Sequence, residues 1–227
     1  MGKMTDLEEE KTCIVSGNLD CKKCDLRSLL ICEIDPKKMR KFVLGNTLYR
    51  LIALTIFIFV GLMTDQWWWF YSYGIIVAFT FILIEPRLLC SHCPHYARAG
   101  KFLKCWALRG MPKLWRYNPG PINKPEKNTM LIFGSFIDIF PFIGAIYGII
   151  VFILNPFSQL IYGIGLISTM IFFSYMAYYF SKILLGDACK RCPNFSCAMN
   201  KVPKEIVNKF LEKNPIMQKA WKEKGKI

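Results

Sequence analysis

Residues 129–154 read TMLIFGSFIDIFPFIGAIYGIIVFIL, and Asp138 is the one charged side chain among them. A helix needs about 20 predominantly apolar residues to cross a bilayer, and this stretch exceeds that length. Three other stretches share its composition, at about 42–63, 67–84 and 160–185. Core helices of soluble proteins are seldom so long and so apolar. The sequence therefore predicts an all-α integral membrane protein with four transmembrane helices.

Connections and charges predict how these helices are arranged. Links 64–66 and 155–159 are short enough to force antiparallel pairing, so we expect two tandem hairpins. Of the 30 Lys and Arg residues, 29 lie in residues 1–41, 85–128 and 182–227, and neither link carries one. Because basic loops face the cytoplasm, both termini and the central segment are expected there, in a multi-pass protein of the cell membrane.

Composition excludes several classes of protein. Hydrophobic residues make up 53% of the chain, which is too high for a disordered protein. The formal net charge of +14 comes from the basic residues that flank the apolar stretches and set the membrane topology. Membrane lipid is therefore an expected partner, and nucleic acid is not.

The same patterns divide the chain into five segments. The expected segments are a cytoplasmic four-cysteine segment (1–41), a first transmembrane hairpin (42–84), a cytoplasmic cysteine-rich loop (85–128), a second hairpin (129–185) and a cytoplasmic cysteine-rich tail with an amphipathic helix (186–227).

The two hairpins end in similar sequences. Residues 90–96 read CSHCPHY and residues 189–195 read CKRCPNF, and we call these segments the first and the second knuckle. A third cysteine follows each knuckle, at Cys105 and Cys197. Two such matches at the same place after two hairpins indicate an internal repeat, although independent use of one metal-binding turn is the alternative. Because the copies have the same orientation, we expect a pseudo-twofold axis along the membrane normal.

All ten cysteines lie outside the apolar stretches, in segments assigned to the cytoplasm. That compartment is reducing, which disfavours structural disulfides and favours metal binding or redox chemistry. Cysteines that served only as small apolar side chains would be scattered among the helices. The predicted metal ligands are Cys13, Cys21, Cys24, Cys32, Cys90, Cys93, Cys105, Cys189, Cys192, Cys197, His92 and His95.

Spacing indicates how these ligands are grouped. The four N-terminal cysteines form a nearly symmetric set that can close one four-thiolate site. The other six fall three and three, and a set of three needs a fourth ligand. Each repeat either holds its own three-thiolate site, with His92 or His95 completing the first, or the two knuckles share one four-thiolate site.

Zinc and an iron–sulfur cluster both suit these ligands, and neither ferredoxin spacing is present to separate them. One expected function is iron–sulfur electron transfer between a cytoplasmic partner protein and a membrane acceptor. The other is a non-enzymatic membrane module whose zinc sites hold the loops for partner binding or assembly. Ten thiols exceed what anchoring two loops requires, which favours the redox function. Thiol–disulfide exchange and metal-ion transport are weaker alternatives, because no βαβ pattern surrounds the knuckles and no cysteine or histidine lies in the apolar stretches.

Two charged residues lie deep inside the apolar stretches, Arg50 about nine residues into the first and Asp138 about ten residues into the third. An isolated charge at such depth costs about 3 kcal/mol or more, so we predict that they form an ion pair. The pair would fix helix register or belong to a proton or substrate path, and the alternative is that Arg50 extends to the interface. Pro141, Gly134, Gly144 and Gly148 predict a kink or close helix contacts in the third helix.

Overall fold

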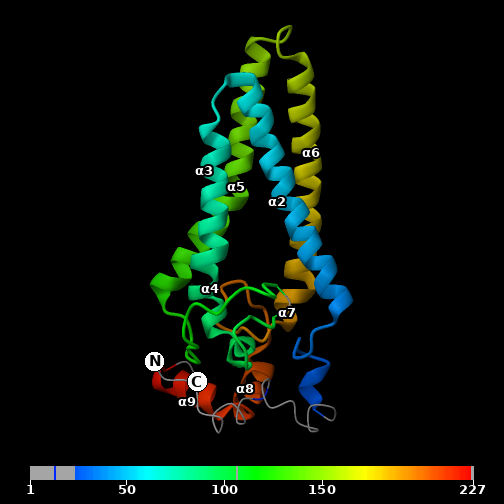
Figure 1. Ribbon diagram of the computed structural model, residues 1–227. Coiled ribbons are helices and arrows are strands. Elements are labelled where there is room, and N and C mark those ends of the chain that lie inside the picture. The colour runs from blue at the N-terminus through cyan, green and yellow to red at the C-terminus, as the bar shows by residue number, and fades with distance from the viewer. Residues whose placement is uncertain (1–12, 14–23, 106, 226–227) are drawn as a thin grey trace. The chain divides into compact units, whose positions relative to one another are not determined.

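The computed structural model describes residues 13, 24–105 and 107–225, so Cys21 lies outside the described residues. In that part of the chain all regular structure is helical, apart from an isolated bridge between Phe102 and Pro112. Four helical stretches are long and apolar enough to span a membrane, which confirms the prediction of an all-helical protein with four such helices (Figure 1). They are Pro36–Thr64, Trp68–His92, Lys124–Leu154 and Leu160–Arg191.

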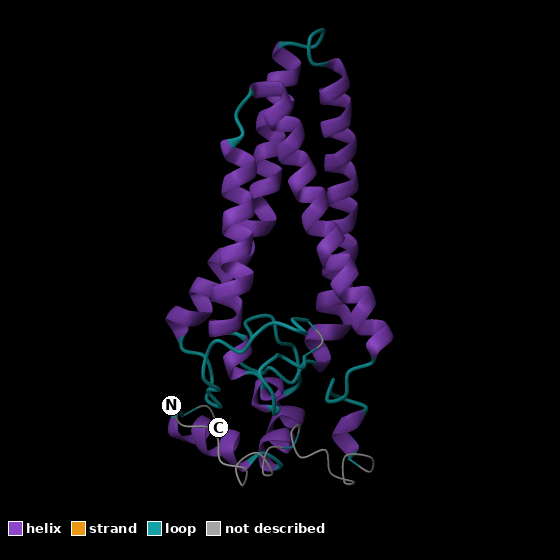
Figure 2. Cartoon of the chain, viewed as in Figure 1, coloured by secondary structure: helices purple, strands orange, loops and turns teal. Residues whose placement is uncertain are grey.

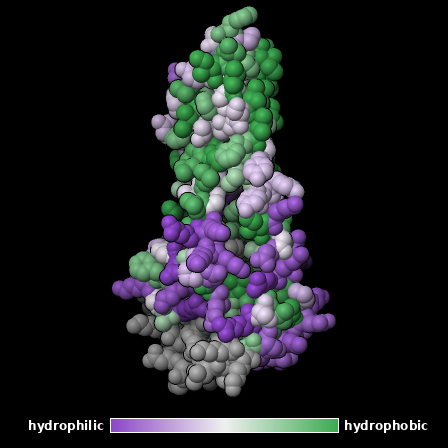
Figure 3. Space-filling model, turned by 90° about the vertical axis from the view of Figure 1, so that its right-hand side faces the viewer, coloured by the Kyte–Doolittle hydropathy of each residue, from purple (hydrophilic) through white to green (hydrophobic). Residues whose placement is uncertain are grey.

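The chain forms two compact units. The helical unit consists of Val43–Leu83 and Leu131–Lys182, and the cysteine-rich unit consists of Met1–Phe42, Ile84–Met130 and Ile183–Ile227. Figure 3 shows hydrophobic side chains over the helical unit and hydrophilic side chains gathered on the cysteine-rich unit. The three cysteine-bearing segments therefore fold together, although they are far apart in the sequence.

The helical unit is built from α2 (Pro36–Thr64), α3 (Trp68–Phe79), α5 (Lys124–Leu154) and α6 (Leu160–Ile183), which run alongside one another (Figure 2). Its core contains buried aliphatic and aromatic side chains from all four helices. Large apolar side chains such as Ile132, Ile153 and Ile161 remain exposed on its outer faces. A surface of this kind suits contact with lipid rather than water.

Two glycines allow α5 to pack closely on its neighbours. A Cβ atom at Gly144 would lie 2.4 Å from Cε1 of Phe57 on α2, and one at Gly148 would lie 2.5 Å from Cδ2 of Leu166 on α6. The prediction of close helix contacts is confirmed at these two positions. It is wrong at Gly134, where no atom lies within 4 Å of the added Cβ.

Helices α3 and α6 each continue toward a knuckle through a widened helical turn. A π-helical turn, Thr80–Ile84, follows α3 and precedes α4 (Glu85–Leu88), and a second π-helical turn, Leu184–Ala188, follows α6 and precedes α7 (Cys189–Arg191). These helices therefore continue past the predicted ends of the apolar stretches.

In both knuckles the backbone becomes extended at the second cysteine, which ends the preceding helical turn. Cys93 has φ −85° and ψ 133°, and Cys192 has φ −73° and ψ 125°. Proline follows each of them and disfavours helical geometry in the residue before it. The common Cys-Pro sequence therefore gives the two knuckles a common local structure.

The C-terminal helices α8 (Lys204–Glu212) and α9 (Pro215–Glu223) are amphipathic and cover the N-terminal segment. Buried Leu26 and Leu30 pack in one cluster with Phe210, Leu211 and Met217. The apolar face of the tail is thus occupied by the protein itself, within the cysteine-rich unit.

Candidate metal centre in the cysteine-rich unit

The two knuckles and their third cysteines contribute thiols to one cluster. Burial raises the pKa of Cys93, and the neighbouring thiols of Cys192, Cys105 and Cys197 raise it further. Burial likewise raises the pKa of Cys192 to about 12, with smaller contributions from Cys197, Cys189 and Cys105. Thiols from different repeats influence one another, so they lie near each other.

We call the six residues the thiol cluster. Its members are Cys90, Cys93, Cys105, Cys189, Cys192 and Cys197, and all six are free thiols.

Backbone N–H groups near these sulfur atoms oppose the rise in pKa in a pattern that repeats. The N–H of His95 lowers the pKa of Cys93, and the N–H of Asn194 lowers that of Cys192, against the larger effect of burial and in each case from two residues further along the chain. Such donors stabilise a thiolate far more than a neutral thiol.

The third cysteine of each repeat has a matched pair of donors. Cys105 accepts from the N–H groups two and three residues further on, with Leu108 N 3.1 Å from the sulfur. Cys197 accepts from the N–H groups at the same two offsets, those of Met199 and Asn200. The sulfur atoms of Cys105 and Cys197 therefore have backbone N–H groups at the same offsets, and these groups favour the thiolate form.

The cluster does not form a closed coordination shell. Among residues 13, 24–105 and 107–225, no three His, Cys, Asp or Glu side chains converge closely enough to hold one metal ion. Because buried thiolates repel one another, ionising several of them together requires a cation. A bound metal would draw the thiols inward and supply that charge.

Glu85 is a member of the site that the cysteine and histidine pattern did not predict. Its carboxylate raises the pKa values of Cys105 and Cys197, after the larger effect of burial, and it also acts on Cys90. It therefore lies near thiols from both repeats. The available sequence signal was an acidic residue at the end of an apolar stretch, five residues before a Cys-x2-Cys pair.

The two histidines are directed at backbone oxygens. His92 Nδ1 lies 2.6 Å from the carbonyl oxygen of Gly120, and its Nε2 lies 4.0 Å from Oε2 of Glu126. His95 Nε2 lies 3.0 Å from the carbonyl oxygen of Ile31, and burial lowers its pKa to about 4. Both ring nitrogens of His92 thus face oxygen atoms, whereas the buried Nδ1 of His95 has no hydrogen-bond partner among the residues that the structure describes.

Hydrogen bonds join each knuckle to a distant segment. Ile31 N donates to Arg191 O at 2.8 Å, which attaches the N-terminal segment to the second knuckle. Asn194 Nδ2 donates to the carbonyl oxygen of Leu89 at 2.9 Å, which attaches the second knuckle to the first. The thiol cluster therefore lies where three segments of the cysteine-rich unit meet.

The N-terminal cysteines lie beside the C-terminal helices. The N–H of Cys13 donates to Oδ1 of Asn214 at 2.6 Å, and Lys213 Nζ lies 3.4 Å from the sulfur of Cys24. Cys24 and Cys32 pack against the apolar cluster formed with α8 and α9. Three of the four predicted N-terminal ligands are thus placed in the cysteine-rich unit, and Cys21 is outside the described residues.

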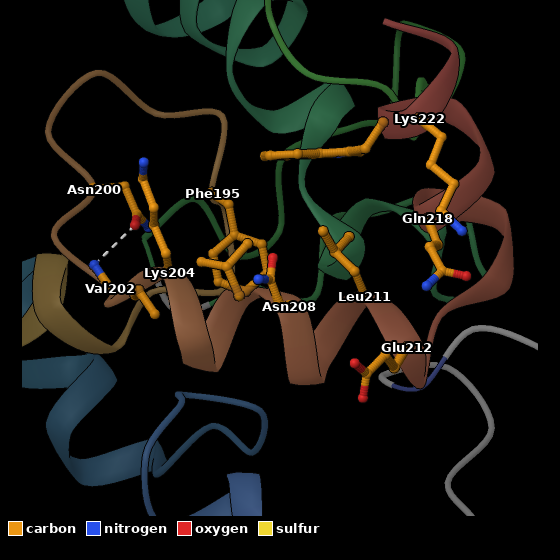
Figure 4. Close-up of a pocket in the computed structure, with 11 residues that line it drawn as sticks. Phe195, Asn200, Val202, Lys204, Asn208, Leu211, Glu212, Gln218 and Lys222 are labelled. Atoms are coloured by element: carbon orange, nitrogen blue, oxygen red, sulfur yellow. Dashed lines mark hydrogen bonds between the residues drawn. The ribbon is translucent and has the colours of Figure 1, made fainter. Parts of the chain in front are cut away.

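An open groove of about 580 Å³ lies beside the second knuckle (Figure 4). Its walls come from α8, α9 and the segment from Phe195 to Val202. Asn200 lines it and donates from Nδ2 to the carbonyl oxygens of Cys192 and Asn194, at 2.8 Å and 3.0 Å. One wall of the groove is therefore bonded directly to the second knuckle.

In the helical unit, Arg50 and Asp138 form the predicted contact. Arg50 Nη1 lies 2.8 Å from Oδ1 of Asp138, and the Tyr49 hydroxyl lies 3.5 Å from the same oxygen. The guanidinium group also lies over the rings of Tyr49 and Phe81. The contact joins α2 to α5, and its aromatic surroundings favour a role in fixing helix register.

Comparison with protein-family models, curated proteins and solved structures gives no match to this chain.

Proposed function

We propose that this protein is an integral membrane metalloprotein in which one metal or iron–sulfur centre is held by cysteines from both repeats. The observation that carries this proposal is the contact of Leu108 N with the sulfur of Cys105, at 3.1 Å, together with matched backbone N–H groups that lower the pKa values of Cys93, Cys192 and Cys197. Hydrogen bonds to sulfur are a recurring feature of thiolate-bound metals and tune their potential. We assign these four sulfurs as the ligands, with Cys90, Cys189 and Glu85 around them.

The proposed topology places this centre on the cytoplasmic side of the membrane. The two helix pairs form tandem hairpins, and the basic segments, which include both termini, face the cytoplasm. A reducing compartment keeps thiols available as ligands. A membrane-impermeant maleimide added to intact cells is expected to label none of the cysteines, and labelling before lysis would contradict the topology.

The proposed activity is electron transfer between a cytoplasmic partner protein and an acceptor in the membrane. Cys93, Cys105, Cys192 and Cys197 would hold the cluster, and a bound cluster would supply one-electron chemistry between the partner and the acceptor. The abundance of thiols beyond the four ligands supports this activity. We expect anaerobically purified protein to contain iron and to absorb visible light.

A structural zinc centre is the second candidate function. The hydrogen bonds among Ile31, Arg191, Asn194 and Leu89 favour it, because the thiol cluster lies at the junction of the folded unit. Structural zinc sites contribute directly to folding. If the purified protein is colourless and contains stoichiometric zinc, the structural zinc function is correct and electron transfer is not. If the protein binds neither zinc nor iron, the proposed metal centre is wrong.

A further inference from the structure

The loop between the first knuckle and α5 is strongly basic. Residues 86–125 contain eight Lys and Arg residues and no Asp or Glu. Three of these cations, Arg98, Lys104 and Arg109, line a cavity of about 400 Å³ together with Glu33 and Ile34. The cavity lies wholly within the cysteine-rich unit.

The backbone holds two of the cations in fixed positions. Leu103 N donates to Met111 O at 2.8 Å, and Gly110 N donates to Leu103 O at 3.1 Å. Gly110 has φ +87°, which glycine adopts without strain. Lys104 and Arg109 therefore stand on opposite sides of a closed turn that also contains Cys105.

Arg98 connects this turn to the N-terminal segment. Its Nη2 donates to the carbonyl oxygen of Cys32 at 3.0 Å, and its Nη1 donates to the carbonyl oxygen of Lys104 at 3.5 Å. These two carbonyl oxygens orient the guanidinium group at the cavity.

The negative charge at the cavity is already compensated. Oε2 of Glu33 lies 2.7 Å from Nη2 of Arg27, which is outside the cavity lining. In the part of the chain that the structure describes, neither Lys104 nor Arg109 forms an ion pair with a carboxylate. The cavity therefore carries excess positive charge.

We propose that this cavity binds a phosphate-bearing anion. Two guanidinium groups and an ammonium group converge there, and phosphate oxygens accept hydrogen bonds from both kinds of donor. The cavity is larger than one phosphate needs, so the ligand carries a further group. A lipid headgroup and a soluble phosphate ester share this chemistry.

The test measures binding of two probes to the full-length protein in a neutral maltoside detergent. The probes are short-chain phosphatidylglycerol and inorganic pyrophosphate, and short-chain phosphatidylcholine is the zwitterionic control. The double variant Lys104→Gln with Arg109→Gln is expected to lower affinity by at least about tenfold, because it removes two charge-assisted contacts. The matched control, Lys209→Gln with Lys219→Gln, removes the same charge from exposed positions on α8 and α9 and is expected to change affinity by less than about twofold.

Each outcome decides the proposal. Binding of phosphatidylglycerol alone identifies a headgroup, binding of pyrophosphate alone identifies a soluble ligand, and binding of both identifies the phosphate group as the determinant. Equal losses in the cavity and control variants, or no binding of either probe, would overturn the site. Where the double variant fails to fold, Arg109→Gln alone is expected to weaken binding severalfold. Metal content is measured on the same samples, so that a loss of anion binding can be distinguished from a loss of the proposed metal centre.

Discussion

The first and second knuckles place sulfur in the same way but differ in the polar residues around it. His92 and His95 in the first correspond to Arg191 and Asn194 in the second. All four side chains bond to backbone carbonyl oxygens of other segments, those of Gly120, Ile31, Ser28 and Leu89 for His92, His95, Arg191 and Asn194.

The N–H donors to sulfur, in contrast, recur at equal offsets in both repeats. The shared features therefore define the thiol cluster, whereas the polar positions attach each knuckle to its own surroundings. This comparison favours cysteine ligands and assigns the histidines to positioning.

The strongest test of the comparison asks whether the repeats share one centre. Cys93→Ser and Cys192→Ser are each expected to remove nearly all of the metal bound by the thiol cluster, and the double variant is expected to lose no more. Residues that act on one site are strongly non-additive. Metal analysis of the purified proteins measures this, with Ser91→Ala as a knuckle control. Loss of half the metal in each single variant would instead show two separate centres.

The second test addresses the ion pair between Arg50 on α2 and Asp138 on α5. Arg50→Leu is expected to lower the free energy of unfolding by about 3 kcal/mol, because it leaves Asp138 charged without a partner in an apolar unit. The charge-free double variant, Arg50→Leu with Asp138→Leu, is expected to recover most of that loss. Helix content followed during titration with a denaturing detergent reports both values. Equal stability of the single and double variants would show that the pair contributes nothing.

The third test addresses the contact between α2 and α5. Gly144→Ala is expected to destabilise the helical unit by about 2 kcal/mol, because the new methyl group meets the buried ring of Phe57. Gly134→Ala is the matched control in the same helix, since open space surrounds it, and is expected to be neutral or slightly stabilising. The thermal midpoint in detergent distinguishes them, and similar midpoints would contradict the packing.

The smallest expected effect comes from altering a histidine. His95→Gln is expected to leave metal content unchanged and to cost about 1 kcal/mol, because glutamine retains a donor for Ile31 but changes its reach. Metal analysis and thermal unfolding check the two halves of this prediction. Loss of metal would show that His95 is a ligand and that the first knuckle differs from the second in its chemistry.

Much of the fold could be predicted because the bilayer imposes simple length and polarity rules. Four long apolar stretches, the close packing at Gly144 and Gly148, and the contact of Arg50 with Asp138 all follow from those rules. Gly134 shows their limit, since small size permits a close contact but does not supply the neighbouring helix. The cysteine pattern likewise indicated a site without giving its grouping.

The sequence by itself determined the four apolar helices, the location of every cysteine outside them, and the local shape of each knuckle. These depend on composition and on neighbours along the chain, such as the proline after Cys93 and Cys192. Only the tertiary structure decided that the segments with the two knuckles fold into one unit, that Glu85 acts on thiols of both segments, and that Arg98, Lys104 and Arg109 line a cavity. Those groupings depend on hydrogen bonds and packing between segments that are distant in sequence, which no local pattern records.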